Sequence, residues 1–128
     1  MNLTRVWWAV GAALIAAAII ICLMPVNQVV APFEWNDKTS HLVGHGTLAL
    51  YFAGLVPRRS WWKIFAGLLL MGICIEFAQH YMRWGREGDP RDVVANSAGA
   101  VLGLVAGWLG LARWPEFAAR LLGRRAVQ

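Results

Sequence analysis

The chain has 128 residues, enough for one domain. Hydrophobic residues make up 59% of it and charged residues only 15%, whereas a soluble domain carries roughly 25% charge. The net charge of +5 does not indicate nucleic-acid binding, because the basic residues flank apolar runs and form no continuous stripe. Basic residues beside membrane spans set orientation and contact anionic headgroups, so the composition favours a membrane protein.

The first apolar run extends from Val6 to Met24, nineteen residues without a charge, and is followed by Pro25. As a helix it covers about 30 Å, the thickness of the hydrocarbon core. A cleaved signal peptide is the rival interpretation, with Arg5 as its basic end and a cleavage site at 29–31. The apolar stretch is too long and too far from that site, so we expect a retained span.

Three further apolar runs predict three further spans. The second is short and reaches a workable length only with Lys38, whose stem can snorkel. Because open strands in lipid would leave backbone groups unpaired, helices are the only reasonable form for these runs. We therefore predict an all-α fold, a single domain over 1–128 built as a bundle of four transmembrane helices. The predicted spans are about 6–24, 39–56, 61–82 and 92–112.

The C-terminal tail predicts a short amphipathic helix on the membrane surface. At helical spacing Arg113, Arg120 and Arg124 fall on one side, with Phe117 and Leu121 on another. Four spans place the tail, the N-terminus and the second connection together, with eight basic residues against four on the opposite side. The positive-inside rule then puts both termini in the cytoplasm and the first and third connections outside.

Polar residues occur in three of the predicted helices near the same outer rim. Within each helix they recur every three or four residues, so they share one face. An ionisable group within a span costs on the order of 3 kcal/mol or more unless it is paired. We therefore expect Glu76 to face the bundle interior, with His41, His45 or Arg86 as its partner. The three stripes are Asp37, His41 and His45, then Glu76, Gln79 and His80, and then Asp92 and Asn96.

Three interpretations of this polar cluster stay open. It forms a pocket for a polar headgroup or an acid/base site, it only locks helices together, or it holds a metal. Two histidines four residues apart with a carboxylate could hold zinc, but the HExxH arrangement is missing, and we expect no metal and no cofactor. Arg86 is suited either to clamp an anion or to anchor in headgroups. Asp92 is expected to be the N-cap of the fourth helix.

The fourth helix also carries Gly99, Gly103 and Gly107 at four-residue spacing. Such a strip removes side chains along one face and lets another helix approach closely. We expect it to serve packing within the chain, and a homo-oligomer stays open as an alternative.

Together these residues resemble the VanZ family of small bacterial membrane proteins, from Asp37 to about Gly107. The resemblance implies a multi-pass protein of the bacterial cytoplasmic (inner) membrane, within the cell envelope. The family is named for a member linked to resistance to the glycopeptide teicoplanin, and it has no established biochemical mechanism. His45 departs from the pattern, which leads us to expect an apolar or aromatic residue there. The matching motifs are Asp37-Lys38-x-x-His41, Glu76-x-x-Gln79, Arg86-x-x-Asp89-x-x-Asp92 and Asn96-x-x-Gly99-x-x-x-Gly103.

The leading functional expectation is that the outward cluster binds a polar lipid or a lipid-linked cell-wall precursor, with an effect on glycopeptide susceptibility. Membrane lipids are the expected partners. An alternative is a membrane enzyme acting on a lipid-linked phosphate or ester, with Glu76 or His41 as base. A third is a structural subunit of a membrane complex. The candidate ligand-binding residues are Asp37, Lys38, His41, His45, Glu76, Gln79, His80, Arg86, Asp89, Asp92 and Asn96.

Overall fold

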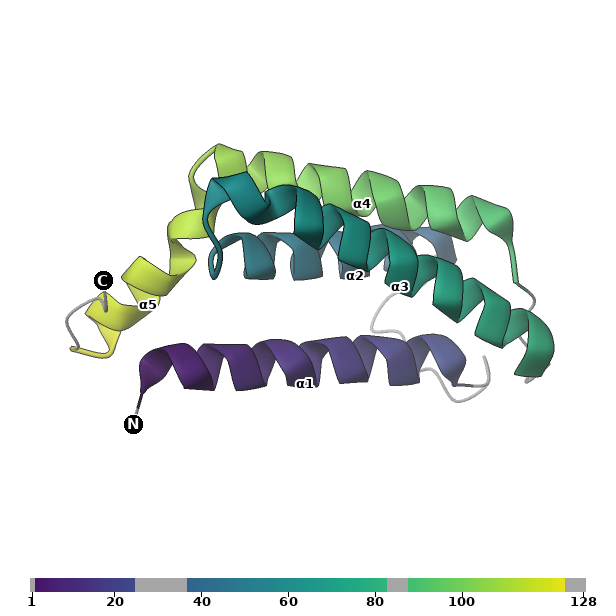
Figure 1. The fold of residues 1–128 in the computed structure, drawn as a ribbon, viewed down its shortest axis with the longest axis horizontal. Helices are drawn as coiled ribbons and strands as arrows, with labels where there is room; N and C mark the ends of the chain where they lie inside the picture. Colours follow the sequence, from purple (N-terminus) through teal and green to yellow (C-terminus); the bar gives the residue numbers. More distant parts are fainter. Residues whose placement is uncertain (1, 25–36, 83–87, 124–128) are drawn as a thin grey trace.

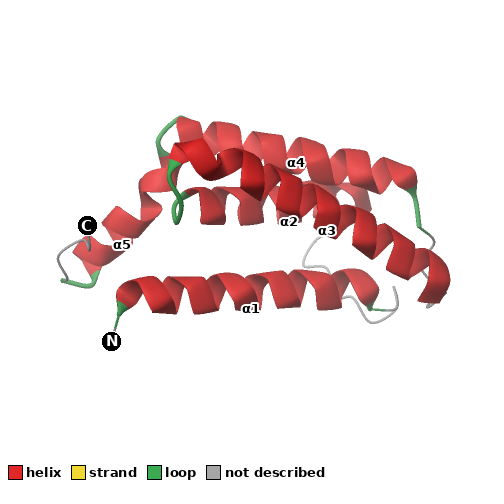
Figure 2. Cartoon of the chain, in the orientation of Figure 1, coloured by secondary structure: helices red, strands yellow, loops and turns green. Residues whose placement is uncertain are grey.

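The computed structural model describes residues 2–24, 37–82 and 88–123, and these are helical apart from short turns (Figure 2). The all-α prediction is confirmed: no strand occurs in the described ranges. Two short 3-10 turns, Arg58–Ser60 and Leu111–Arg113, lie between α-helices. The α-helices are α1 (Leu3–Leu23), α2 (Asp37–Ala53), α3 (Trp61–Met82), α4 (Pro90–Trp108) and α5 (Trp114–Leu121).

Length and composition make two of the described helices able to cross a membrane, α1 and the segment Arg58–Met82 that contains α3. A third arises if Pro90–Trp108 and Leu111–Leu121, which bend by 74°, form one broken span. Helix α2 does not qualify: it has 17 residues, which as a helix extend over only about 26 Å, and its first half is polar. The helical character of the predicted bundle is therefore confirmed, while its count of four spans stays a prediction.

Helices α2 and α4 form the most closely packed pair of the bundle, and glycines of α4 make this approach feasible. A Cβ on Gly99 would collide with the backbone carbonyl of Leu42, and one on Gly103 with the backbone carbonyl of Gly46. A Cβ on Gly107 would lie 3.2 Å from the Trp61 ring. The glycine strip thus faces α2 and the start of α3, where the backbones contact each other directly.

The apolar core lies in the middle of the bundle, where Leu48 and Ala49 of α2 meet Leu68 of α3 and Ala100 of α4. Helix α1 runs along one side of this three-helix unit (Figure 1). Side chains of the unit bind backbone carbonyls near both ends of α1. The Tyr51 hydroxyl donates to the carbonyl of Trp7 at 2.7 Å, and the Gln79 amide donates to that of Cys22 at 2.7 Å.

Large apolar side chains cover much of the outer surface along the helices. Ile20 of α1, Leu70 and Phe77 of α3 and Val94 of α4 are each about 60% exposed or more. A soluble monomer rarely shows contiguous apolar surface on this scale. In α1 the only buried residues are Leu3 and Gly11. This exterior suits a lipid environment and fits poorly with water.

The C-terminal helix α5 leaves the bundle at the end where the N-terminus also lies (Figure 1). Trp114 attaches it there, because its ring stacks on Tyr51 with centroids 4.8 Å apart. The Trp114 indole N–H also donates to the Tyr51 carbonyl at 3.1 Å. Ala119 is buried, whereas Phe117 and Leu121 are exposed. The predicted tail helix is therefore present, and its position on a membrane surface stays a prediction.

Candidate functional site

Buried polar side chains gather at the end of the bundle where α2 begins, α3 ends and α4 begins (Figure 1). Each of the three helices contributes, because the polar residues recur at helical spacing on inward faces. Six of them are less than a tenth exposed. These are His41 4%, His45 3%, Glu76 8%, Gln79 4%, Asp92 2% and Asn96 1%.

The start of α4 is capped by Asp89. Its carboxylate accepts from the backbone N–H of Arg91 at 2.9 Å, and Pro90 occupies the first helical position. The expectation that Asp92 is the N-cap is therefore wrong. Because the fixed φ of Pro90 suits the first helical residue, the cap falls one residue before it. This leaves the Asp92 side chain available to face α2.

Lys38 joins the N-terminus of α2 to the N-terminus of α4. Its ammonium donates to Asp89 Oδ2 and to Asp92 Oδ1, both at 3.0 Å. Asp92 is buried whereas Lys38 and Asp89 are partly exposed, so the ion pairs extend from the interior to the surface. The Arg91 backbone N–H, and then Lys38, lower the pKa of Asp89 below 3.8.

His41 lies between two residues of α4. Its Nδ1 is 2.9 Å from Oδ1 of Asn96, and its Nε2 is 3.5 Å from Oδ2 of Asp92. An amide oxygen can only accept, so Nδ1 carries the hydrogen and Nε2 faces the carboxylate. Asn96 and Asp92 are four residues apart on one helix face, which lets them fix the imidazole from two sides.

Glu76 connects the end of α3 to the turn before α4. Its Oε2 accepts from the backbone N–H of Asp89 at 2.7 Å. Gly88 permits this contact, because a Cβ there would lie 2.8 Å from the Glu76 carbonyl oxygen. Glu76 thus faces the interior. Of the partners named from the sequence, Arg86 lies outside the described residues.

Three side chains of the cluster could together hold a metal ion. His41, Glu76 and Asp92 each offer one ligand atom, and these atoms lie within 4.8 Å of one another. One imidazole nitrogen and two carboxylate oxygens form a donor set that zinc accepts. The sequence-based expectation that the protein needs no metal stays a prediction.

Other candidate residues do not join these contacts. Gln79 binds the Cys22 carbonyl on α1. His45 is buried one turn from His41, and its Nε2 has no hydrogen-bond partner among the described residues. His80 is exposed and lies edge-on to the Tyr81 ring, with centroids 5.5 Å apart. Asp37 begins α2, but its side chain is outside the described part.

One residue that sequence reasoning missed is Gly72. A Cβ there would lie 2.8 Å from Nδ2 of Asn96, so this glycine makes the space that the buried amide occupies. A glycine inside an apolar helix was the available indication, although α3 also contains Gly67 and the sequence does not distinguish the two. The residues that the structure brings together are Lys38, His41, Glu76, Asp89, Asp92 and Asn96.

A cavity of about 310 Å³ adjoins the cluster between α3 and the start of α4. Glu76 is one of its lining residues, so the cavity and the polar cluster share this residue. The lining is otherwise mostly apolar. It consists of Ile73, Glu76, Phe77, His80, Gly88, Pro90 and Val93.

An apolar helical exterior, with ionisable side chains gathered inside one end of the bundle, defines a small all-α membrane protein. A comparison with family models finds a match to VanZ/LLP1 over residues 3–111. The chain belongs to the VanZ/LLP1 family, and the match includes α1 as well as the part that carries the polar motifs. Comparisons with curated proteins and with solved structures gave no match.

Proposed function

We propose that the polar cluster binds the headgroup of a polar lipid or of a lipid-linked cell-wall precursor from within the membrane. One observation carries this proposal: Glu76, which is buried in the cluster, is also one of the residues that line the 310 Å³ cavity. The cavity is within the range of about 300–1,000 Å³ usual for small-molecule sites.

The chemistry of the cavity fits an amphiphile. Ile73, Phe77 and Val93 offer apolar surface to a hydrocarbon chain, and Phe77 is 60% exposed on the outside of α3. Glu76 offers a hydrogen-bond acceptor beside them. A carboxylate selects donors, so the headgroup that suits this site carries hydroxyl or amino groups, such as a sugar or an amine.

The proposed membrane arrangement has four spans, with both termini in the cytoplasm and the polar cluster near the exterior leaflet. The two termini lie at one end of the bundle, and the cluster lies at the other (Figure 1). Exposed Arg58, Arg59 and Arg113 lie at the end with the termini, in keeping with the positive-inside rule. At the exterior leaflet the cluster would meet the lipid-linked precursors that glycopeptides recognise, and altered glycopeptide susceptibility is the expected consequence.

The test is Glu76→Gln, whose amide oxygen can still accept from the Asp89 N–H. The protein is reconstituted in nanodiscs containing phosphatidylethanolamine or a lipid-linked disaccharide-peptide precursor, and bound lipid is counted by native mass spectrometry. We expect the variant to lose the bound probe with an unchanged melting temperature. Glu116→Gln is the matched control, because Glu116 is an exposed carboxylate of α5. Equal retention of both probes by parent and Glu76→Gln would refute the proposal.

A membrane enzyme acting on a lipid-linked phosphate or ester is a second candidate, favoured by the orientation of His41. An imidazole that donates from Nδ1 to Asn96 leaves Nε2 without a proton, the form that a general base requires, and this nitrogen faces the Asp92 carboxylate at 3.5 Å. Turnover of the precursor by the purified protein, abolished in His41→Gln, would identify an enzyme. Binding without turnover supports the first proposal alone.

A further inference from the structure

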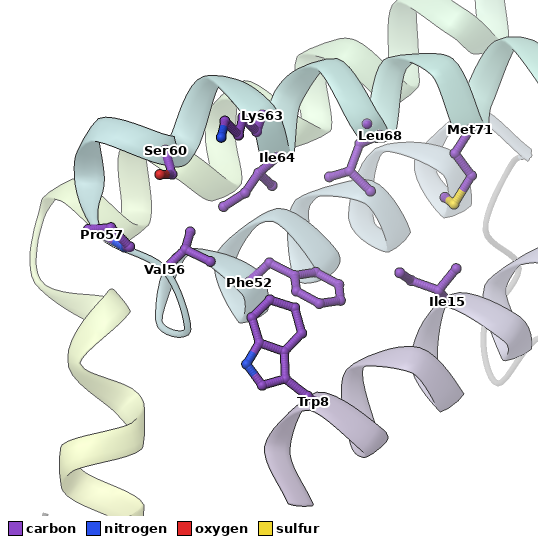
Figure 3. A pocket seen from close by; sticks show the side chains of 11 residues that line it. Trp8, Ile15, Phe52, Val56, Pro57, Ser60, Lys63, Ile64, Leu68 and Met71 are labelled. Carbon is purple, nitrogen blue, oxygen red and sulfur yellow. The ribbon is translucent and has the colours of Figure 1, made fainter. Parts of the chain in front are cut away.

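A second and larger cavity, of about 590 Å³, lies between α1, α2 and α3 (Figure 3). Its walls are mostly apolar along its length. The rings of Trp8 and Phe52 are adjacent there, with centroids 5.9 Å apart. Ile15 of α1 faces Leu68 and Met71 of α3 farther along (Figure 3). The cavity is thus a groove suited to a hydrocarbon chain.

One end of this groove is polar and cationic. Ser60 and Lys63 line it where α3 begins, beside Pro57 of the α2–α3 connection (Figure 3). The Lys63 ammonium lies 5.7 Å from the centre of the Trp62 ring. Aromatic rings and basic side chains together are typical of the membrane interface. The groove therefore begins at headgroup level and continues toward the middle of the bundle.

We propose that this groove binds one acyl chain of an anionic phospholipid, whose phosphate contacts Lys63 and Ser60. An ammonium and a hydroxyl are suitable donors for phosphate oxygens. Arg58 and Arg59, both exposed, add positive charge at the same end. This charge favours a lipid with a net negative headgroup over a zwitterionic one.

The lipid-chain site is independent of the proposed headgroup site. Its polar end is lined where α2 ends and α3 begins, whereas the cavity at Glu76 is lined where α3 ends and α4 begins. Figure 1 shows that these helix ends lie at opposite ends of the bundle, the first of them beside the termini. The two cavities share no lining residue. A variant of one site therefore leaves the other intact, and either proposal can fail alone.

Gly67 allows the groove to be filled. It lines the cavity, and a Cβ built there meets nothing within 4 Å. Gly67→Leu should therefore fold and occupy the space of the acyl chain. Gly44→Leu is the matched control, because a Cβ on Gly44 also meets nothing within 4 Å and Gly44 does not line the groove. Equal melting temperatures in lipid-free detergent verify that both variants fold.

The purified proteins are incubated with equal amounts of phosphatidylglycerol and phosphatidylcholine, and bound lipids are counted by native mass spectrometry. We expect the parent and Gly44→Leu to retain phosphatidylglycerol preferentially, and Gly67→Leu to retain one lipid fewer. Lys63→Gln should keep a bound lipid but show a weaker preference for phosphatidylglycerol, because Arg58 and Arg59 remain. Arg120→Gln on α5 should keep both the lipid and the full preference. Equal retention by Gly67→Leu and Gly44→Leu, or no preference in the parent, would overturn the proposal.

Discussion

His41 of α2 and Asn96 of α4 form a buried hydrogen bond, with Nδ1 and Oδ1 2.9 Å apart. Both side chains are less than 5% exposed. The bond lies between α2 and α4, the two most closely packed helices. Along α4, Asn96 comes one turn before Gly99, the first of the glycines that let the two backbones approach. It therefore connects the packing of the bundle with the geometry of the polar cluster.

Asn96→Ala should lower the free energy of unfolding in detergent by about 1 kcal/mol or more, because it leaves the buried His41 imidazole without its amide acceptor. Interhelical hydrogen bonds in membrane proteins contribute only about 0.6 kcal/mol on average. We expect a larger loss here because the His41 imidazole that loses its partner is buried. The hydroxyl of the neighbouring Ser97 donates to the Val93 carbonyl of its own helix at 2.8 Å. Ser97→Ala should thus have a smaller effect in the same unfolding titration, and similar losses in both variants would contradict this assignment.

Two glycine-to-alanine substitutions should change the free energy of unfolding in opposite directions. Gly99→Ala places a methyl group against the Leu42 carbonyl and should destabilise the bundle by about 1–3 kcal/mol. Gly44→Ala meets open space and should stabilise it by about 0.5–1 kcal/mol through helix propensity. Thermal unfolding of both variants in one detergent measures the contrast. A stabilising Gly99→Ala would show that α2 and α4 are not in contact there.

Tyr51→Phe removes the hydroxyl that binds the Trp7 carbonyl at 2.7 Å, and should cost about 0.5–1.5 kcal/mol. Tyr81 is 77% exposed on α3. Tyr81→Phe should accordingly leave the unfolding midpoint within error of the parent. Hydrogen exchange of the first turns of α1 should also increase in Tyr51→Phe alone, and unchanged exchange there would argue against this attachment of α1.

The stability of the α4 N-terminus should depend on pH through Asp89. Its pKa is lowered in the folded protein, first by the Arg91 N–H and then by Lys38. The contribution is therefore complete well above 3.8 and is lost as the pH falls through the lower folded-state pKa. Melting temperatures measured between pH 7 and about pH 2 should fall in the parent, and fall less in Asp89→Asn. Parallel pH profiles would contradict this role.

The apolar pattern predicted where the helices lie better than where they end. The predicted 61–82 coincides with α3, and 6–24 differs from α1 by three residues at its start. The fourth run was predicted to continue to residue 112, but α4 ends at Trp108. Gly110 has a positive φ of 119° and redirects the chain. Because the turn is as apolar as the helix before it, hydropathy could not locate this end.

The spacing of polar residues predicted the inward faces of the helices, but not the atoms that meet there. Glu76 binds the main-chain N–H of Asp89, and Gln79 binds the main-chain carbonyl of Cys22. Backbone groups are present at every position, so side-chain patterns give no information about which one is bound. Asp89 is the N-cap of α4 because Pro90 occupies the first helical position. The preference of proline for that position is a local rule that could have been applied to the sequence.

The attachment of α1 has a consequence for how this helix can diverge among related chains. The two hydrogen bonds described above, at Trp7 and at Cys22, are accepted by backbone carbonyl oxygens, which every amino acid possesses. Substitutions along α1 are therefore limited by the need for hydrophobic side chains and by the need for a small residue at position 11. A Cβ on Gly11 would lie 2.9 Å from the Phe52 ring. Tyr51 and Gln79, which supply the donors, should tolerate exchange far less than the residues they hold.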